Sequence, residues 1–317
     1  MRNSGSLSRM MSGVVGTTVL IAAFTAFADV AVAQTKKPTP HPPRTDDFAA
    51  IAQTLGRKGA PNPGGVMKFG FPRSDLQVMV GDVQVKPALA LGGWVAFKSV
   101  GGGKAIALGD LVLTSDEVGP VMQRLQEGGI SETAVHNHLL GENPRVMYMH
   151  VMAEGDPARI AETLRNALGE SKTPMTMSPP ATPDAAIDLD TAAVAHALGY
   201  AGKVNGGVYQ VSIPRAERIT DMGHEIPPSM GMATGINFQP TGGGKAAITG
   251  DFVLLGSEVN PVMRALRENG IQVTAVHSHM LQENPRLFFM HFWANDDATK
   301  LAGGLHAALA HANVKRG

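Results

Sequence analysis

The sequence predicts an α+β protein of two tandem homologous modules, each with a mostly antiparallel sheet flanked by helices, related by a pseudo-two-fold axis. A repeated block is the first observation behind this prediction. The segment HNHLLGENPRVMYMH at residues 136–150 returns as HSHMLQENPRLFFMH at residues 277–291, with three histidines, a glutamate and an arginine in the same places. The second observation is that helical and strand-like hydrophobic patterns follow one another in the same order in each module.

The first part of each module predicts a helix and three strands. An amphipathic helix ends at a glycine, in DFAAIAQTLG and again in DTAAVAHALG. A strand follows, where GGVMKFGFPR matches GGVYQVSIPR, and then two strands joined by a glycine-rich turn, where FKSVGGGKAIALGD matches FQPTGGGKAAITGD. The sequence GGGK lacks the spacing of a phosphate-binding loop and precedes a strand, so we interpret it as a hairpin turn.

The second part of each module predicts a helix, a β pair and a closing helix. GPVMQRLQEGGI and NPVMRALRENGI indicate a helix with proline at its first position, after a glycine or asparagine cap. SETAVHNHL and RVMYMHVMA are β-rich runs on either side of the turn sequence GENP. DPARIAETLRNAL then closes the first module as a helix that Asp156 caps.

The N-terminal residues are typical of a targeting segment. Arg2 and Arg9 precede the apolar run GVVGTTVLIAAFTAFA, and AVA supplies small residues before a cleavage point at Gln34. We therefore expect an exported protein, periplasmic or extracellular, with no membrane span after signal cleavage. The expected organisation is a signal peptide (1–33), a Pro-rich tether (34–45), the first module (46–168), a Pro/Ser/Thr-rich linker (169–187) and the second module (188–317).

Composition narrows the class of function. Hydrophobic residues make up 44% of the 317 residues and charged residues 17%, which is typical of a folded chain. The formal net charge is +0 and no run of lysine or arginine occurs, which argues against nucleic-acid binding. The chain has no cysteine, so disulfides, a cysteine nucleophile and a cysteine-based zinc site are excluded. Any metal ion must be held by histidine and carboxylate.

The repeated histidines have the spacing of metal ligands. Residues two apart in a strand face the same side, about 6.6 Å apart along the chain, so His136 and His138 project together. A turn at GENPR would return His150 beside them on the next strand. Imidazole nitrogens suit a divalent transition metal, with zinc favoured and copper, manganese or iron as alternatives. The predicted metal ligands are His136, His138 and His150 in one module and His277, His279 and His291 in the other.

Two further residues of the block suggest catalytic roles. Glu142 and Glu283 are candidate bases beside the ion, and Arg145 and Arg286 are candidate clamps for an anionic substrate. An ion pair between each arginine and its glutamate, holding the turn, is an equally weighted alternative.

Other interpretations of the polar residues stay open. The histidines and glutamates could act as acid and base without a metal, or could be structural. Asp110 and Asp251, which follow the glycine-rich hairpins, could orient a ligand histidine, although we favour solvated turn carboxylates.

The doubled HNHLLGENPR and HSHMLQENPR, the GGGKA hairpins and NPVM resemble the lppY/lpqO family of secreted or lipid-anchored bacterial proteins of unknown function. The resemblance covers nearly all of residues 46–312 and implies the doubled layout without a reaction. Lipid-anchored members need a cysteine after the signal, so the resemblance implies a released protein here.

These observations favour an exported metal-binding enzyme of hydrolytic type, acting on a small-molecule or anionic substrate at an ion-bound water. A non-catalytic periplasmic metal-binding or metal-buffering protein is the first alternative. A metal-free sugar- or peptide-binding module is the second. In each case we expect the two modules to pair within the chain.

Overall fold

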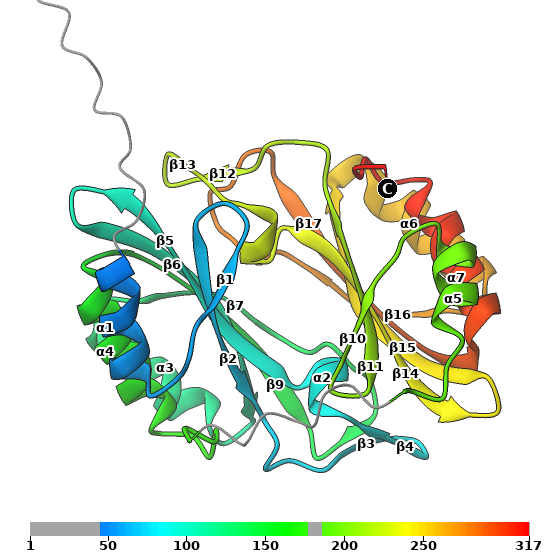
Figure 1. Cartoon of the computed structure of the whole chain (residues 1–317), viewed down its shortest axis with the longest axis horizontal. Coiled ribbons are helices and arrows are strands. Elements are labelled where there is room, and N and C mark those ends of the chain that lie inside the picture. Colours follow the sequence, from blue (N-terminus) through cyan, green and yellow to red (C-terminus); the bar gives the residue numbers. More distant parts are fainter. Residues whose placement is uncertain (1–44, 177–185, 317) are drawn as a thin grey trace, which may run out of the picture. The chain divides into compact units, whose positions relative to one another are not determined.

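The computed structural model describes residues 45–176 and 186–316, which we call the first and second half (Figure 1). The predicted signal peptide, the predicted tether up to residue 44 and residues 177–185 of the predicted linker lie outside these residues. Each half contains one six-stranded sheet in which every neighbouring pair is antiparallel. The first sheet has the order β1 (Ala60–Asn62), β2 (Val66–Pro72), β5 (Gly92–Gly101), β6 (Lys104–Thr114), β9 (Val146–Gly155) and β7 (Ser131–His136). The second has the order β10 (Lys203–Asn205), β11 (Val208–Pro214), β14 (Ala233–Gly242), β15 (Lys245–Leu255), β17 (Leu287–Asp297) and β16 (Gln272–His277).

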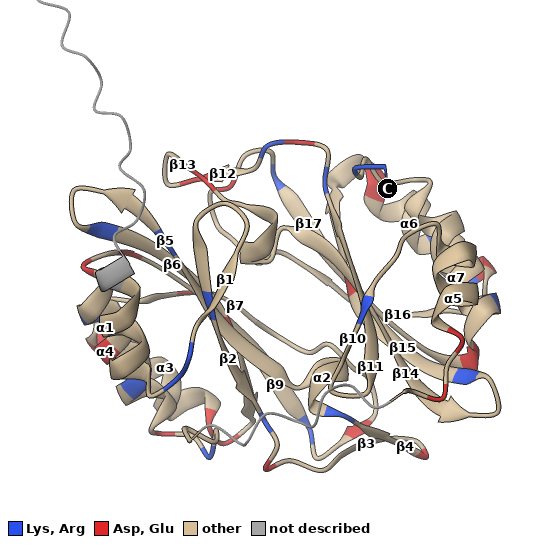
Figure 2. Ribbon diagram, in the orientation of Figure 1, with Lys and Arg blue, Asp and Glu red and all other residues tan. Residues whose placement is uncertain are grey.

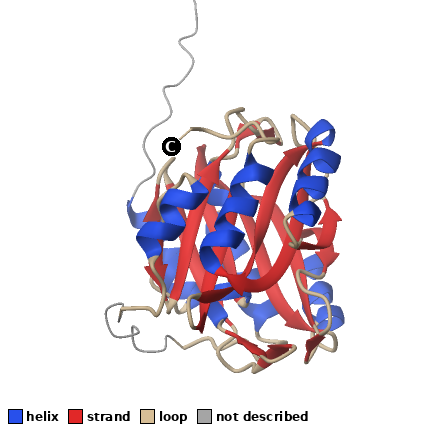
Figure 3. Cartoon of the chain, turned by 90° about the vertical axis from the view of Figure 1, so that its right-hand side faces the viewer, coloured by secondary structure: helices blue, strands red, loops and turns tan. Residues whose placement is uncertain are grey.

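Helices cover the outer face of each sheet, so the two halves form four layers, helix–sheet–sheet–helix (Figures 1 and 3). Phe69, Phe97 and Met149 belong to the core beneath the first set of helices, and Phe238 and Met290 to the core beneath the second. The covering helices are α1 (Thr45–Leu55), α3 (Val118–Glu127) and α4 (Pro157–Leu168) in the first half, and α5 (Thr191–Leu198), α6 (Gly256–Glu268) and α7 (Ala298–Leu309) in the second. The α+β prediction with two similar, mostly antiparallel halves is confirmed.

Successive side chains of a strand point to opposite faces of the sheet, so every second side chain faces the opposite half. Along β9, Met149 and Val151 pack into the helix-covered core, whereas Tyr148 and Met152 belong to clusters shared by the two halves. His150 lies between these two and faces the same way, because side chains two apart share one face of a sheet. The period of two thus places a histidine in the layer between the sheets.

The contacts between the halves are reciprocal. The hydroxyl of Thr133 donates to the carbonyl oxygen of His279, and the hydroxyl of Thr274 donates to the carbonyl oxygen of His138. Thr133 is equivalent to Thr274, and His138 is equivalent to His279. Each half therefore donates one of these hydrogen bonds and accepts the other. Such reciprocity is the mark of a two-fold relationship between similar units.

Several predicted elements are confirmed in detail. The GGGK segments are hairpin turns, with Gly101, Gly102 and Gly103 all at positive φ between β5 and β6. Asp156 caps α4 by accepting hydrogen bonds from the backbone of residues 158 and 159. Glycines also end α1 and α5, where Gly56 has φ 63° and Gly199 has φ 81°.

The predicted start of one helix in each half is wrong. The expected first residues were Pro120 and Pro261, but α3 begins at Val118 and α6 begins at Gly256, which leaves Pro261 inside its helix. The reason is a glutamate in the preceding turn. Glu258 accepts a hydrogen bond from the Leu255 backbone, and the equivalent Glu117, directly before α3, accepts one from the Thr114 backbone.

Small elements differ between the halves. In the first half, β3 (Val78–Val80), β4 (Val83–Val85) and β8 (Glu142–Asn143) form a three-stranded sheet beside α2 (Pro87–Ala90). The second half has a two-stranded hairpin of β12 (Thr220–Asp221) and β13 (His224–Glu225), followed by the 3₁₀ turn η1 (Pro228–Met230).

Charged residues of both signs are interspersed over the two halves (Figure 2). None of the helices in the described ranges is both long enough and apolar enough to span a membrane.

Candidate metal centre

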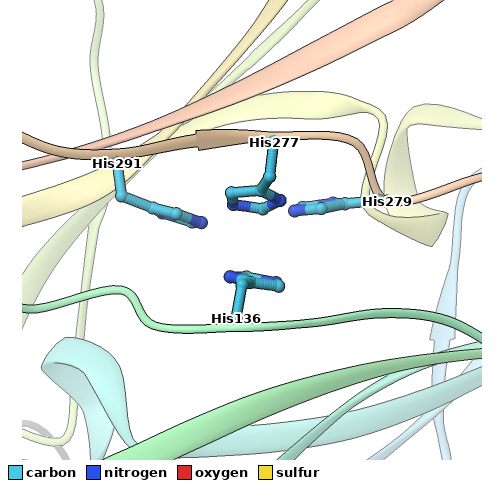
Figure 4. A group of neighbouring side chains, drawn as sticks. All are labelled: His136, His277, His279 and His291. Atoms are coloured by element: carbon cyan, nitrogen blue, oxygen red, sulfur yellow. The ribbon is translucent and has the colours of Figure 1, made fainter.

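Six histidines meet in the layer between the two sheets. His136 ends β7 and His138 follows two residues later, while His150 lies in the middle of β9. The second half supplies the equivalent three from β16 and β17. Figure 4 shows His136 reaching toward His277 and its neighbours from the opposite side. The sequence thus predicted each triad, and the structure brings the two triads to one place.

The imidazole rings interdigitate in three stacked pairs, and each pair joins one ring from each half. A stack of this kind needs neutral rings, because two imidazolium ions at this separation would repel strongly. The pairs are His136 with His277 (3.6 Å between ring centroids), His138 with His291 (3.8 Å) and His150 with His279 (3.6 Å).

The ring nitrogens are close enough to share an ion. In each of two groups, one ligand atom per residue lies within 4.8 Å of every other. Nitrogens bound at about 2.1 Å to one tetrahedral ion lie about 3.4 Å apart, so side-chain movements on the order of an ångström would bring a group onto one ion. The groups are His136, His138 and His150, and His136, His277, His279 and His291.

His136 belongs to both groups, so the structure corrects the expectation of two separate sites, one in each module. The physical reason is the face-to-face packing of the sheets, which places both histidine-bearing faces in the same layer.

Backbone carbonyls determine which nitrogen faces the centre. A carbonyl oxygen only accepts, so an imidazole Nδ1 beside it carries the proton and the Nε2 lone pair is free. The three contacts of this kind are Nδ1 of His291 with Gly250 O (2.8 Å), of His136 with Asn137 O (3.2 Å) and of His277 with Ser278 O (3.5 Å). Oriented histidines of this kind are typical of metal sites.

The Nε2 atoms of all six histidines are buried and have no hydrogen-bond partner. Buried polar atoms are nearly always satisfied in folded proteins, and six in one cluster need a common explanation. A bound cation would satisfy them together, and the Nδ1 contacts of His136, His277 and His291 leave their Nε2 lone pairs free for it.

Burial keeps the imidazoles neutral. It lowers the pKa of His136 to about 3, an effect to which the neighbouring His277 adds, and it lowers the pKa of His277 to about 4. Burial, together with nearby histidines, also places the pKa values of the other four rings well below the usual imidazole range. A neutral imidazole is the form that binds a metal ion.

A buried aspartate, Asp110, and a half-buried one, Asp251, flank the histidines. Asp110 in β6 is directly opposite His150 in the strand register, and Asp251 in β15 is opposite His291. Asp251 Oδ2 lies 3.7 Å from Nε2 of His279. Burial raises the pKa of the Asp110 carboxyl to about 8 and that of Asp251 well above its usual value.

The favoured interpretation of these aspartates as solvated turn residues is therefore wrong. The strands extend well past the predicted hairpins, to Thr114 and Leu255, so each aspartate lies within a buried strand. Their position next to the histidines offers a carboxylate ligand or a proton acceptor at the centre.

Glu283 and Arg286 hold their own turn. Glu283 accepts hydrogen bonds from the Leu287 backbone (2.9 Å) and from the Arg286 guanidinium (3.2 Å). In the first half, Arg145 Nε lies 4.0 Å from Glu142, and the two Glu142 carboxylate oxygens are buried without a hydrogen bond. Neither glutamate belongs to the two ligand groups. The contacts in the second half match the turn-holding ion pair, and the catalytic roles of all four residues stay predictions.

A cavity of about 980 Å³ opens beside the centre, between the two halves. Its volume is at the upper end of the range for small-molecule sites. None of the described residues lining it is an arginine, so Arg145 and Arg286 do not face it. Its walls include His138, His150, His279, His291, Asp110, Asp251, Lys68 and Trp94.

Lys68 and Trp94 were missed at the sequence level. They carry no repeat signal, because the equivalent positions of the second half hold Gln210 and Gly235. Only the sheet register shows that they share a wall with Asp110, which is the cross-strand partner of Trp94.

Comparisons with known proteins give a family and no reaction. A family model described as Domain of Unknown Function (DUF1259) matches residues 49–170 and again residues 192–311, together more than half of the chain. The lppY/lpqO name is not part of that description. No curated protein matches the sequence. Among solved structures, the crystal structure of a trimeric bacterial microcompartment shell protein, PduB, matches at 12% identity, covering 80% of this chain and 89% of that chain. Its TM-score of 0.21 is too low to carry an argument.

Proposed function

The chain belongs to the family of the Domain of Unknown Function (DUF1259), as two copies of that domain, and we propose that it is a metal-dependent enzyme of hydrolytic type. The observation that carries this proposal is the set of six inward-facing Nε2 atoms, buried and without partners, in two overlapping ligand groups. Clustered neutral imidazoles of this kind are costly to bury unless they bind something.

The donor set favours zinc. Nitrogen ligands with one or two nearby carboxylates and no thiolate suit zinc, and they also suit copper, iron and manganese. The halves share one centre, so we propose that they bind the ion jointly.

The cavity supports a catalytic role. Four of the six histidines and both aspartates line its wall, so a small molecule in the cavity would lie against the centre. A zinc-type ion in such a site supplies an activated water at neutral pH. Asp110 and Asp251 each have a carboxyl oxygen within about 4 Å of a histidine Nε2, and a bound cation would lower the pKa that burial raises, so that either could accept a proton. These aspartates replace Glu142 and Glu283 as our candidate bases.

Export is part of the proposal and rests on the signal-like sequence of residues 1–33. Oxidation outside the cytoplasm can convert a cysteine ligand into a form that no longer binds metal. A site made of histidines does not have this weakness, which is compatible with export.

Metal removal tests the catalytic proposal. The protein from Gln34 onward would be screened against ester, amide and phosphoester substrates as purified, after chelation, and after zinc is restored. We expect hydrolysis of one class, lost on chelation and regained with zinc. Metal-loaded protein that hydrolyses none of these substrates would contradict the enzymatic proposal while leaving the metal site intact.

One observation favours a second candidate, a non-catalytic metal-binding protein. Six imidazoles are twice the three protein ligands of a typical catalytic zinc, and an ion saturated by protein ligands has no open position. Cobalt-substituted protein separates the two functions. Added azide would change the visible spectrum of an open, catalytic centre and would leave a closed, storage-type centre unchanged.

A further inference from the structure

The two halves line the cavity differently, although the histidines and aspartates are equivalent. Lys68 in β2 and Trp94 in β5 face the cavity from the first half. Gln210 occupies the position of Lys68 in the second half, and its side-chain amide is already used in a hydrogen bond to the carbonyl oxygen of Ala88. At these two equivalent positions the cavity wall is therefore asymmetric, with a lysine in the first half and a hydrogen-bonded glutamine in the second.

The Lys68 ammonium is held in place by an aromatic ring. Its Nζ lies 3.8 Å from the centroid of the Trp94 ring system, within the range of a cation–π contact. The indole is itself wedged against the other half, because a Cβ on Gly231 would lie only 3.1 Å from its edge. Gly231 also has φ 89°, a conformation that favours glycine. A larger residue there would therefore be strained in its backbone and would crowd the indole.

Lys68 forms no direct ion pair with a described residue, although the nearby Asp110 carboxyl raises its pKa against the larger effect of burial. Across the described residues, no carboxylate forms an ion pair with it and no acceptor receives a hydrogen bond from it, whereas the buried Arg73 nearby in sequence is fully paired. Lys68 is half-buried in the cavity wall and contributes positive charge there. Burial lowers its pKa to about 8, which leaves most of the lysine charged at neutral pH.

We propose that Lys68, positioned by Trp94, binds the carboxylate of a small organic acid whose other end reaches the histidine centre. The contact between the acid and the histidine centre rests on the proposed function. A single lysine neutralises one negative charge, and the described cavity lining has no arginine fork and includes Lys203 as its one other cation. These features fit a carboxylate better than a phosphate, which usually takes several donors.

Calorimetric titration with malonate, succinate and glutarate tests this proposal. The titrations compare wild type, Lys68→Gln, Lys68→Arg and the control Lys203→Gln, which removes the exposed lysine of β10 that also lines the cavity. We expect Lys68→Gln to weaken binding of the best acid by about tenfold, which is the scale of one charge-assisted contact. Lys68→Arg should recover most of this loss, and Lys203→Gln should change little.

Elemental analysis of the same samples separates the two proposals. Metal-loaded wild type whose acid binding is unchanged in Lys68→Gln would overturn the carboxylate anchor and leave the metal centre standing. Protein that binds no metal but still shows lysine-dependent acid binding would overturn the metal centre and leave the anchor. Failure of all three acids to bind, or tighter binding of inorganic phosphate, would also overturn the anchor.

Discussion

The imidazoles of His136 and His277, which occupy equivalent positions in the two halves, stack face to face with 3.6 Å between their ring centroids. Each ring therefore lies among the histidines of the opposite half as well as those of its own. The first half alone supplies one ligand group, His136, His138 and His150, whereas the group of four combines His136 with three histidines of the second half. The two copies thus bring their histidine-bearing faces together in one layer.

The first prediction follows from the shared position of His136. It belongs to both ligand groups, whereas His138 belongs to one. We expect His136→Ala to weaken zinc affinity more than His138→Ala does, with a loss on the order of 100-fold or more for His136. Competition with a fluorescent chelator measures both affinities. Equal losses for the two variants would show that the ion is bound by His136, His138 and His150 alone, and not by the group of four.

The second prediction concerns the aspartates. In the metal-loaded protein, where the cation would favour the carboxylate form, Asp110→Asn and Asp251→Asn keep the side-chain shape and remove the proton acceptor, so we expect kcat to fall by about 100-fold in at least one variant. Metal content, measured on the same samples, should stay close to that of wild type. If activity and metal are lost together, the aspartate is a ligand and not a base.

The third prediction is the pH dependence of stability in the metal-free protein. Unfolded histidine has a pKa of about 6.5, whereas burial lowers that of His136 to about 3 and that of His277 to about 4. As the pH falls below about 6.5, the unfolded chain therefore takes up protons that the folded protein does not, and the folded state loses stability.

The aspartates act in the opposite direction. Burial raises the pKa of Asp110 to about 8, so the folded protein keeps a proton there that the unfolded chain loses above about pH 4. The six histidines outnumber the two aspartates, so the net effect is destabilisation on acidification. Urea denaturation of chelated protein between pH 7 and pH 4.5 measures this effect. Constant or rising stability over that interval would contradict the neutral, buried histidine cluster.

The fourth prediction concerns a buried ion pair that both halves repeat. Arg73 donates to Glu117 (2.6 Å) and to the carbonyl oxygen of Val112 (2.8 Å), and Arg215 makes the equivalent contacts in the second half. Arg73→Ala leaves a buried carboxylate without its partner, so we expect a loss of about 3–5 kcal/mol in the free energy of unfolding.

Arg124→Ala is the matched control for this variant. Arg124 also pairs with glutamates, but its side chain is 50% exposed, and exposed pairs contribute little to stability. A similar loss for both variants would mean that the buried pair has no special role.

The fold was largely predictable because its signals are local. Glycine-rich turns, the Asp156 cap and the alternation of β9 each follow from a few neighbouring residues. The two histidine triads were predictable for the same reason, since His-x-His and the returning strand lie within fifteen residues. Errors arose where a distant or small effect decided the outcome, such as the glutamate that starts α6 before Pro261.

The convergence of the triads was not predictable in this way. It depends on how two sheets pack, which is decided by many apolar contacts far apart in the sequence, such as those between Met152 and Met280 in a shared cluster. Lys68 and Trp94 were not predicted, because candidate site residues were recognised by their repetition in both halves. The second half has Gln210 and Gly235 at the equivalent positions.

The most direct test of the central claim is the metal content of the protein from Gln34 onward, purified without an affinity tag. Elemental analysis of wild type, His136→Ala and the control His311→Ala, whose histidine is exposed, would follow incubation with zinc. The histidine centre predicts stoichiometric metal in wild type and His311→Ala, and loss of most of it in His136→Ala. Wild type that holds no zinc, and no copper, manganese or iron after the same incubation, would contradict a metal centre between the two halves.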